Sequence, residues 1–450
     1  MKALIARIKQ HLIEDRVLSR VLKNTGYLFS ATSIGLLLSL VQSIFAARLL
    51  GVAAFGLISI ITTFVSNVSR LFSFRMGEFI MRYLGKELTE DNRAKAGAVV
   101  KLAMLVEGVT SLVAFGVLML LAPLGAKYVA KDVQALPLIQ LFAVSILAKM
   151  FSETSIGILQ ITNHFRAQAF VNLGQSVITA LLILLAFLLK GDIYFVLMAY
   201  LVGKIILGVA PFILSLYYLP RHLERGWWKT PLSKLLPFRE IALYTLSTNL
   251  SGTVKMVATE SEPLIVGYFL DQQAVGLYKL ALSIVNPLMM PITPFISTTF
   301  PEMTRSVVSK AWGQLRNLLK RVTLISAGWT GLVMLVMLIA GKWLIKLFYG
   351  SEFLPAYPVT MLMLVGFGVA NIFFWNRSLL LSFGKANIPL LVLLAVAVVK
   401  TGLAFWVVPR MGGFGEGLLL TGYLVISTGI LVLLGLRMIK RGGQVAQDNG

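Results

Sequence analysis

The amino-acid sequence predicts an all-α, polytopic membrane protein with twelve transmembrane helices arranged as two parallel six-helix lobes. Twelve stretches are apolar enough to cross a bilayer, whose hydrocarbon core of about 30 Å needs about 20 helical residues. The hydrophobic fraction is 57% and the mean hydropathy is +0.84. The longest links, Arg75–Ala98 and Tyr217–Glu240, are too short to hold a soluble domain. Any activity is therefore expected inside the helical bundle or at its two faces.

Residues 1–22 are expected to form an amphipathic helix on the cytoplasmic membrane surface. Apolar residues between Leu4 and Leu12 recur at helical spacing, and basic residues occupy the remaining faces. The apolar stretch that follows is longer than the hydrophobic region of a signal peptide. We therefore interpret the start of the chain as a surface helix rather than a cleaved leader.

Two halves with equal numbers of apolar stretches follow. The predicted N-terminal lobe is residues 23–216, and a basic linker, residues 217–240, carries three prolines. The predicted C-terminal lobe is residues 241–436, and residues 437–450 form a cytoplasmic tail. In chain order the predicted spans are Tyr27–Ala47, Ala54–Phe74, Val99–Leu121, Leu138–Leu159, Ala169–Leu189, Tyr194–Leu216, Ile241–Tyr268, Leu277–Phe300, Val322–Ala340, Val359–Phe383, Leu390–Val408 and Gly417–Leu436.

The chain repeats itself once, at an offset of 220 residues. The turn at Arg48–Leu57 matches the turn at Tyr268–Leu277, with Gly56 aligned to Gly276. Each turn joins an odd-numbered span to an even-numbered one, so the two halves share one orientation in the membrane. A coincidence of small residues in two tight turns is the alternative, and the equal span counts disfavour it. Parallel lobes that meet near the bilayer midplane are typical of transporters.

Basic residues are distributed unevenly between the two predicted membrane faces. The termini and the even-numbered links carry 26 Lys and Arg residues, whereas the odd-numbered links carry 7. By the positive-inside rule, both termini are cytoplasmic in a multi-pass protein of the cell membrane. Contact with anionic lipid headgroups also accounts for the net charge of +22. We therefore expect membrane lipids, and no nucleic acid, as partners.

The two repeated turns carry a family resemblance. The run Ala47–Leu57, with Arg-Leu-Leu-Gly followed by Phe-Gly-Leu, resembles the start of the second helix in Wzx-type polysaccharide flippases. That family belongs to the multidrug/oligosaccharidyl-lipid/polysaccharide exporter superfamily. The run Gly267–Tyr278, leading to Phe300-Pro301, resembles its seventh-to-eighth helix turn. Span number and cytoplasmic termini also match, so the resemblance covers essentially the whole chain.

This resemblance implies two lobes in a V that flip a polyprenyl-pyrophosphate oligosaccharide from the inner to the outer leaflet. Transport would proceed by alternating access during cell-surface polysaccharide export. The lipid-linked oligosaccharide is then the expected partner, together with other polysaccharide assembly proteins.

A group of charged residues at the cytoplasmic end of the second span departs from the family pattern. Glu78 follows Gly77, where family members usually have a small or hydroxyl residue. Arg75, Glu78 and Arg82 lie on one helical face, and we interpret them as a portal or gate for the substrate headgroup. The alternative is that these charged side chains pair with one another on the protein surface and contact no substrate. Further portal or gate candidates, for which snorkelling is the alternative, are Arg48 and Arg377.

Lysines deep within the spans are the candidate substrate residues. An ionisable group at a helix centre costs about 2.5–3.5 kcal/mol on insertion scales, so each needs a physical reason. We predict a cationic, watered cavity, which suits a pyrophosphate or acidic sugars. The predicted cavity lysines are Lys149, Lys204, Lys255 and Lys400.

Acidic residues within the spans are candidates for coupling transport to an ion gradient. The spacing also permits ion pairs along one helix face, between Lys149 and Glu153 and between Lys255 and Glu262. Lys204 and Lys400 have no such partner on their own predicted helices, so cross-helix pairing with Glu107 or Glu260 is the alternative to a cavity. The four acidic candidates are Glu107, Glu153, Glu260 and Glu262.

Several kinds of chemistry are absent from the sequence. No G-x-x-x-x-G-K-[ST] run is present to bind nucleotide phosphates, and the chain contains no cysteine. The three histidines, His11, His164 and His222, fall at cytoplasmic positions. We therefore expect no catalytic residue, no metal site and no cofactor, and we do not expect an enzyme.

Three prolines in the eighth span predict a break in that helix. Pro287, Pro291 and Pro294 each remove a backbone donor and clash with the carbonyl four residues earlier. We interpret this segment as a hinge between inward-open and outward-open states, with a static kink as the alternative. The equivalent stretch of the first half, residues 66–74, has no proline, so the lobes are expected to bend unequally.

Two other functions compete with a flippase. A multidrug exporter of the same superfamily would be expected to have a cavity rich in carboxylates, which the deep lysines disfavour. A membrane glycan polymerase or ligase would be expected to need a large outer loop, whereas the outer links here are short. A pure scaffold in a polysaccharide complex is disfavoured by the deep charges.

The charge asymmetry yields a direct test of orientation. A cysteine at Gln273 should react with an impermeant thiol reagent in intact cells, whereas a cysteine at Ser309 should not, because the two sites lie on opposite faces. The natural lack of cysteine removes background labelling. Equal labelling at both sites would contradict the predicted orientation.

Overall fold

The chain is an all-α polytopic membrane protein. The structure, a computed structural model, describes residues 16–221, 226–232, 256–385 and 387–448, together with Leu223 and Thr253, and this part of the chain has no strand. Eight of the described helices are long and apolar enough to cross a membrane. Residues 1–15 of the predicted surface helix, and residues 222, 224–225 and 233–240 of the predicted linker, lie outside the described residues.

A turn at Gly51 divides the first helix, α2 (Arg16–Leu71), into two limbs. Gly51 has φ 71°, a left-handed conformation that glycine adopts without steric cost. The turn falls between the first two predicted spans. The other first-half elements are α3 (Met76–Thr89), α4 (Arg93–Leu124), the π-helical turn η1 (Gly125–Val129), α5 (Ala135–Ala148), α6 (Ser152–Ile161), α7 (Phe165–Leu188), α8 (Ile193–Tyr218), and the 3-10 turns η2 (Leu219–Arg221) and η3 (Trp227–Lys229).

The last helix, α16 (Asn387–Asp448), turns in the same way at Gly412, where φ is 63°. Each of these two divided helices counts once among the eight candidate spans, although each contains two predicted spans. The remaining second-half elements are α10 (Glu262–Phe269), α11 (Gln272–Met289), the 3-10 turn η5 (Met290–Ile292), α12 (Thr293–Val308), α13 (Trp312–Phe348), the 3-10 turn η6 (Ser351–Phe353), α14 (Ala356–Ile372) and α15 (Asn376–Ser382).

Helix boundaries follow the 220-residue repeat. At this offset, Thr89 at the end of α3 corresponds to Ser309, one residue after the end of α12. Arg93 at the start of α4 corresponds to Gly313, one residue after the start of α13. The break between α5 and α6 at residues 149–151 and the break between α14 and α15 at residues 373–375 hold the same place in the order of helices, four residues away from this offset. The two halves are therefore built from the same succession of helices.

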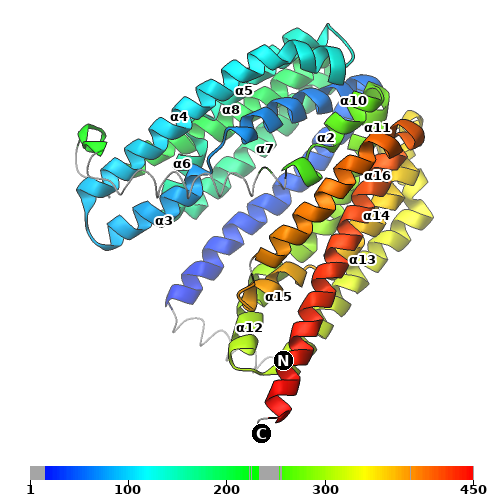
Figure 1. Cartoon of the computed structure of the whole chain (residues 1–450). Coiled ribbons are helices and arrows are strands. Elements are labelled where there is room, and N and C mark those ends of the chain that lie inside the picture. The colour runs from blue at the N-terminus through cyan, green and yellow to red at the C-terminus, as the bar shows by residue number, and fades with distance from the viewer. Residues whose placement is uncertain are drawn as a thin grey trace.

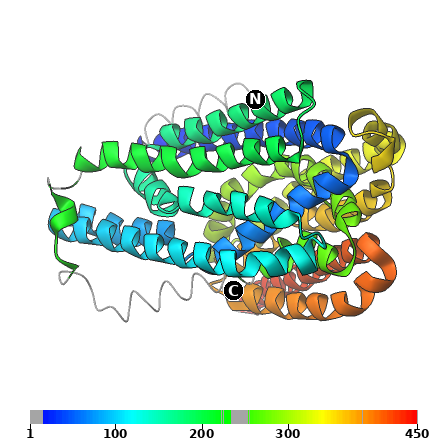
Figure 2. The same cartoon turned by 90° about the horizontal axis from the view of Figure 1, so that it is seen from above.

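The two halves share a hydrophobic core at one end of the molecule and have separate cores at the other. The shared cluster contains buried residues of α2, α5 and α8 together with residues of α11 and α14. A second cluster belongs to α3, α4 and α6, and a third belongs to α12, α13, α15 and α16. The two groups of ribbons diverge toward the end where α16 finishes (Figure 1). Seen from above, the first half fills the left of the view and the second half the right, with an overlap in the middle (Figure 2).

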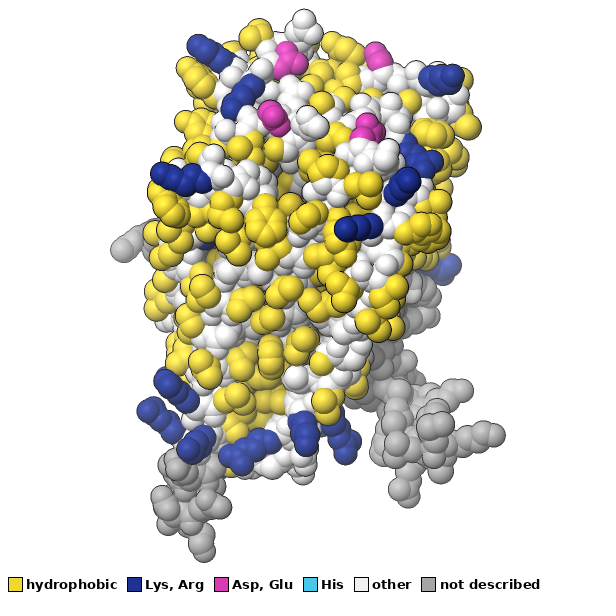
Figure 3. Space-filling model, turned by 90° about the vertical axis from the view of Figure 1, so that its right-hand side faces the viewer, with side chains coloured by type: hydrophobic (Ala, Val, Ile, Leu, Met, Phe, Trp, Pro, Cys, Tyr) yellow, Lys and Arg dark blue, Asp and Glu magenta, His cyan; other side chains and the backbone are white. Residues whose placement is uncertain are grey.

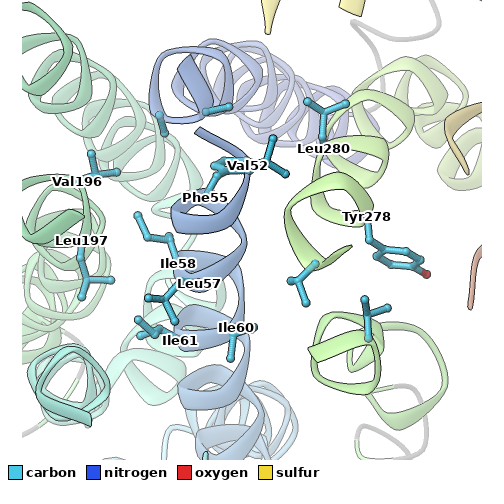
Figure 4. Packing of buried hydrophobic residues seen from close by; sticks show 14 of the residues in the cluster. Val52, Phe55, Leu57, Ile58, Ile60, Ile61, Val196, Leu197, Tyr278 and Leu280 are labelled. Atoms are coloured by element: carbon cyan, nitrogen blue, oxygen red, sulfur yellow. The ribbon is translucent and has the colours of Figure 1, made fainter. Parts of the chain in front are cut away.

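Backbones of the two halves approach most closely at the repeated glycines. A Cβ atom on Gly56 would overlap the carbonyl oxygen of Gln272, and one on Gly276 would overlap the carbonyl oxygen of Val52. Small residues allow helices in membranes to approach in this way. Around this contact, the second limb of α2 lies between Val196 and Leu197 of α8 on one side and α11 on the other (Figure 4). The repeat-equivalent turns therefore pack against each other.

Polar contacts between the halves surround this packing. The side-chain amide of Gln272 donates to the Ala130 carbonyl at 2.9 Å, and the hydroxyls of Ser43 and Tyr349 lie 2.9 Å apart. Arg48 and Lys131 donate to backbone carbonyls of the second half, those of Leu347 and Leu270 respectively. These contacts hold the halves together at the end where the glycines meet.

Both halves interrupt the helix that follows this contact. In the second half, α11 ends at Met289 and a 3-10 turn precedes α12, with the indole of Trp329 donating to the freed Leu288 carbonyl at 2.9 Å. In the first half, α2 ends at Leu71 and α3 begins at Met76, with Arg75 left-handed at φ 52°. The lack of proline in the first half therefore does not keep that helix continuous.

The surface is consistent with a membrane environment. On the face formed by the second half, a band of hydrophobic side chains lies between charged side chains at the two ends (Figure 3). Lys and Arg side chains lie toward both ends of this face, whereas its Asp and Glu side chains lie only toward the end opposite to the end of α16. Lipid-facing apolar residues include Leu338, Ile339 and Phe405, all well exposed.

Replacing Gly56 with Val should prevent the halves from closing at this end, because the obstructing atoms are backbone and cannot rotate away. In purified protein, a cysteine at Ser43, which is buried here, should become reactive toward a water-soluble thiol reagent. The matched control is Gly116→Val, since nothing lies within 4 Å of that Cβ. A folded Gly56→Val protein whose Ser43→Cys thiol stays protected would contradict this role.

Candidate functional site

A broken helix in the first half positions the candidate charges. Residues Lys149 to Phe151 separate α5 from α6, so the backbone amides at the start of α6 lack helical partners. Glu107 of α4 satisfies them: its Oε1 accepts from the Glu153 amide at 2.8 Å and its Oε2 from the Thr154 amide at 3.0 Å. A carboxylate is also favoured at a helix N-terminus by the helix dipole. The geometry therefore gives Glu107 a capping role, and its predicted role in ion coupling stays a prediction.

Lys149 and Glu153 lie on either side of the helix break, where their charges interact without forming an ion pair. The predicted ion pair needs one continuous helix face, and the structure does not form it. Glu153 instead accepts a hydrogen bond from the Ser73 hydroxyl at 2.8 Å. Lys149 makes no hydrogen bond or ion pair in the described part of the chain, and its side chain is exposed in the protein. It is thus available to a ligand.

Lys149 belongs to a group of cations that meets between the two halves. Lys204 of α8 lies within electrostatic range of Arg70, Lys149 and Lys279, the last of these from α11 of the second half. Like Lys149, neither Lys204 nor Lys279 has a hydrogen-bond or ion-pair partner among the described residues, and both are partly exposed. We call Arg70, Lys149, Lys204 and Lys279 the central cation cluster.

The central cation cluster adjoins the last contacts between the halves. Arg70 forms an ion pair with Glu260, and three residues earlier the Asn67 amide donates to the Ser261 hydroxyl at 2.9 Å. Glu260 is therefore paired across the halves. The charge of Arg70 also interacts with Glu153 and Arg75. The cluster thus includes Arg70, which pairs with the second half, and Lys279, which lies three residues from the Gly276 contact.

Sequence reasoning missed two members of this cluster. Arg70 and Lys279 lie near the ends of predicted spans, where a long basic side chain is expected to snorkel to the membrane surface. One signal points to Lys279: it is three residues from Gly276, so it lies on the face that the repeat turns toward the first half. Arg70 immediately precedes the end of α2, and only the structure brings it to Lys204.

The predicted portal or gate residues divide between the two ends of the molecule. Arg75 and Glu78 form an ion pair at 3.0 Å across one helical turn, as the alternative of pairing on the surface requires. Arg82 lies over the Tyr83 ring at 5.4 Å. Arg377 is exposed on α15 at the same end. Arg48 lies at the opposite end, where it bonds to Leu347 of the second half.

Lys400 occupies a separate, fully buried site in the second half. Its Nζ lies 2.9 Å from Glu262 Oε1, 3.1 Å from Glu416 Oε1 and 3.0 Å from the Ala258 carbonyl oxygen. Lys400 is only 3% exposed. The prediction that Lys400 lines a cavity is therefore wrong, and its acidic partners are Glu262 and Glu416 rather than Glu107 or Glu260. The fold of α16 at Gly412 brings Glu416 to Lys400. We call Lys400, Glu262 and Glu416 the buried triad.

Glu416 was not predicted as a site residue because it lies just outside the last predicted span, in a glycine-rich turn. Lys255, the predicted partner of Glu262, lies outside the described residues. Within the described part of the chain, no group of three or more His, Asp or Glu side chains is arranged to hold a metal ion.

Comparison with known proteins identifies relatives of this arrangement. A family model described as polysaccharide biosynthesis protein matches residues 21–307. The chain is 24% identical over 370 residues to the inner membrane protein YghQ of Escherichia coli strain K12, covering 78% of this chain and 98% of that protein.

Solved structures share the fold. An inward-facing multidrug resistance MATE transporter of the MOP superfamily has a TM-score of 0.74 at 13% identity, covering 91% of this chain and 96% of that one. The lipid II flippase MurJ, in an inward closed conformation, has a TM-score of 0.73 at 14% identity, covering 90% and 87%. An outward-facing MATE structure has a TM-score of 0.59 at 14% identity, covering 93% and 96%. The fold is thus that of MOP superfamily transporters.

Replacing Glu107 with Ala should destabilise the fold. Two buried amides at the start of α6 would lose their acceptors, and each such loss costs about 1–3 kcal/mol. Glu107→Gln keeps one acceptor oxygen, so this variant should lose less stability than Glu107→Ala. Thermal unfolding in detergent measures both changes, with the exposed Glu90→Ala as control. Unchanged melting of Glu107→Ala would contradict the capping role.

Proposed function

The chain belongs to the polysaccharide biosynthesis protein family, and we propose that it flips a lipid-linked oligosaccharide across the cell membrane. The substrate class is a polyprenyl-pyrophosphate oligosaccharide, moved from the inner to the outer leaflet. The central cation cluster is the observation that supports this proposal most directly.

The central cation cluster suits a diphosphate chemically. Lysine ammonium and arginine guanidinium groups donate charge-assisted hydrogen bonds to phosphate oxygens, and these are stronger than neutral ones. Nearby acids are already engaged: Glu107 caps α6, Glu153 accepts from Ser73, and Glu260 pairs with Arg70. Lys149, Lys204 and Lys279 make no hydrogen bond or ion pair within the described part of the chain, which makes them available to a substrate anion. Deep unpaired charges of this kind mark substrate pathways in membrane proteins.

The proposed topology has twelve spans, two six-helix lobes and cytoplasmic termini. The turns at Gly51 and Gly412 divide α2 and α16 into two spans each, which supports the larger count. In the predicted orientation, the halves are packed together on the outer side and separate toward the cytoplasm, as the two distinct cores at that end indicate. The higher TM-score with inward-facing than with outward-facing MATE structures supports an inward-facing state. The name of the YghQ relative supports an inner-membrane location.

Alternating access would then require the outer contact to open and the cytoplasmic ends to close. We place the hinge of the second lobe at the proline-bearing break formed by Pro287, Pro291 and Pro294, where the helix is already interrupted. The headgroup would enter past Arg75, Glu78 and Arg82 on one side and Arg377 on the other. An identical bend at Met290–Ile292 in inward- and outward-facing structures would contradict the hinge.

A multidrug exporter is the second candidate function, because the fold is shared with MATE transporters. The charge of the site disfavours it, since a cluster of unpaired lysines repels the cationic compounds that such exporters carry. A glycan polymerase or ligase remains disfavoured by the short outer links.

Replacing Lys204 or Lys149 with Ala should slow flipping while insertion and folding are retained. A hydrogen bond to a charged group contributes about 1.5–3 kcal/mol, so the rate at low substrate should fall roughly 10- to 100-fold. The measurement uses proteoliposomes containing a fluorescent polyprenyl-pyrophosphate oligosaccharide and follows its accessibility in the outer leaflet. Lys204→Arg keeps the charge and should keep part of the rate.

Lys320→Ala, which removes an exposed lysine of α13 outside the cluster, is the matched control. Absence of protein-dependent flipping in the parent protein would overturn the proposed function. Full activity of both Lys204→Ala and Lys149→Ala would overturn the role of the cluster.

A further inference from the structure

Helix α7 has one polar face and one apolar face. Polar side chains that recur at helical spacing share about 100° of its circumference, and they are Gln168, Asn172, Gln175, Ser176 and Thr179. The opposite face exposes large apolar side chains, namely Phe170, Val177, Ile178, Leu181 and Leu185. Because the apolar face suits lipid, the polar face is the one that turns toward protein or water.

The polar face of α7 lies between α2 and α8, which pack on either side of it. On the α2 side, the Gln42 amide donates to the Ser176 carbonyl at 2.9 Å. On the α8 side, a Cβ atom on Gly203 would lie 2.8 Å from Nε2 of Gln175. Lys204 of the central cation cluster is the next residue of α8 after Gly203. The polar face of α7 therefore reaches the segment that carries a cation of the cluster.

Amide groups nearer the start of α7 are not fully used by the protein. The Asn172 side chain makes no hydrogen bond among the residues that the structure describes. Gln168 uses only its carbonyl oxygen, which accepts from Nε2 of Gln160 at 3.2 Å. Both side chains are partly exposed, and both lie in a helix apolar and long enough to span a membrane. Polar groups in such a helix need water or a ligand where protein partners are lacking, so this face borders a watered space.

The chemistry of this face differs from that of the central cation cluster. Side-chain amides and hydroxyls both donate and accept hydrogen bonds, and they match the hydroxyl and N-acetyl groups of sugars in this respect. The single charged residue of α7 is Arg166, at its second position, so the polar face itself is uncharged. Donors and acceptors that line a transport path determine what the path selects. A neutral polar face beside a cation cluster thus suits a ligand with a glycan next to its phosphates.

We propose that Gln168, Asn172 and Gln175 form a glycan subsite, which binds the sugars that follow the diphosphate of the substrate. This inference rests on the proposed function, in which the central cation cluster binds the diphosphate. Gln175 lies beside the segment that carries Lys204, and Gln168 lies about 10 Å farther along the axis, toward the start of α7. The start of α7 is cytoplasmic in the predicted orientation. The glycan therefore extends from the cluster along α7 toward the cytoplasm, with its first sugar at Gln175 and Asn172.

The test measures the affinity of the purified protein for two lipids by native mass spectrometry. One is polyprenyl diphosphate bearing an N-acetylglucosamine trisaccharide, and the other is bare polyprenyl diphosphate. The parent protein should bind the sugar-bearing lipid more tightly. Asn172→Leu removes one neutral hydrogen bond, so it should weaken binding of that lipid roughly 2- to 10-fold and leave the bare lipid unaffected. It should melt with the parent protein, and Gln314→Leu, which removes an exposed amide of α13, is the matched control.

Combining Gln168→Met, Asn172→Leu and Gln175→Met should abolish the preference for the sugar-bearing lipid, whereas Lys204→Ala should weaken binding of both lipids. Equal affinity of the parent protein for the two lipids would overturn the glycan subsite, as would a full preference in the folded triple variant. If the triple variant does not fold, Asn172→Leu and Gln168→Met decide singly by the same criterion. A parent protein that prefers the sugar-bearing lipid but does not flip it in proteoliposomes would overturn the proposed function and leave the subsite standing.

Discussion

The close approach of the two halves at Gly56 and Gly276 is the constraint on which the rest of the structure depends. Each glycine accepts the backbone of the opposite half at a distance that no larger side chain allows. The helices that begin there, the second limb of α2 and α11, consequently diverge from a common contact. Everything that follows along them, including Arg70 and Lys279, is placed by that first approach.

The deep charges divide into two groups with different physical environments. In the central cation cluster, Arg70 pairs with Glu260, whereas Lys149, Lys204 and Lys279 make no hydrogen bond or ion pair among the residues that the structure describes. The buried triad lies inside the second half, where Lys400 is enclosed with two carboxyls. Insertion cost alone does not separate these cases, because each lysine is expensive in lipid. What separates them is whether a neighbouring helix brings an acid within reach.

Much of the fold could be predicted from the sequence because it depends on local and periodic properties. Apolar length identifies the helices, and the aligned Gly56 and Gly276 identify the repeat whose boundaries the helices follow. The site was harder to predict from the sequence because it depends on helix breaks and on pairing between distant segments. The interruption after Ala148 removes the continuous face on which a Lys149–Glu153 pair was predicted. The fold of α16 at Gly412 supplies Glu416 to Lys400, and no spacing rule anticipates that.

The repeat also explains why the two halves carry different chemistry on one scaffold. At the 220-residue offset, Glu262, Lys400 and Glu416 correspond to Gln42, Ala180 and Val196, none of which is charged. Lys149 and Lys204 correspond to Val369 and Leu424, which are apolar. The glycine contact is therefore common to both halves, whereas the unpaired lysines of the first half and the triad of the second are not. Halves that meet at one contact need symmetry only there, so each half is free to hold a different charged site beside it.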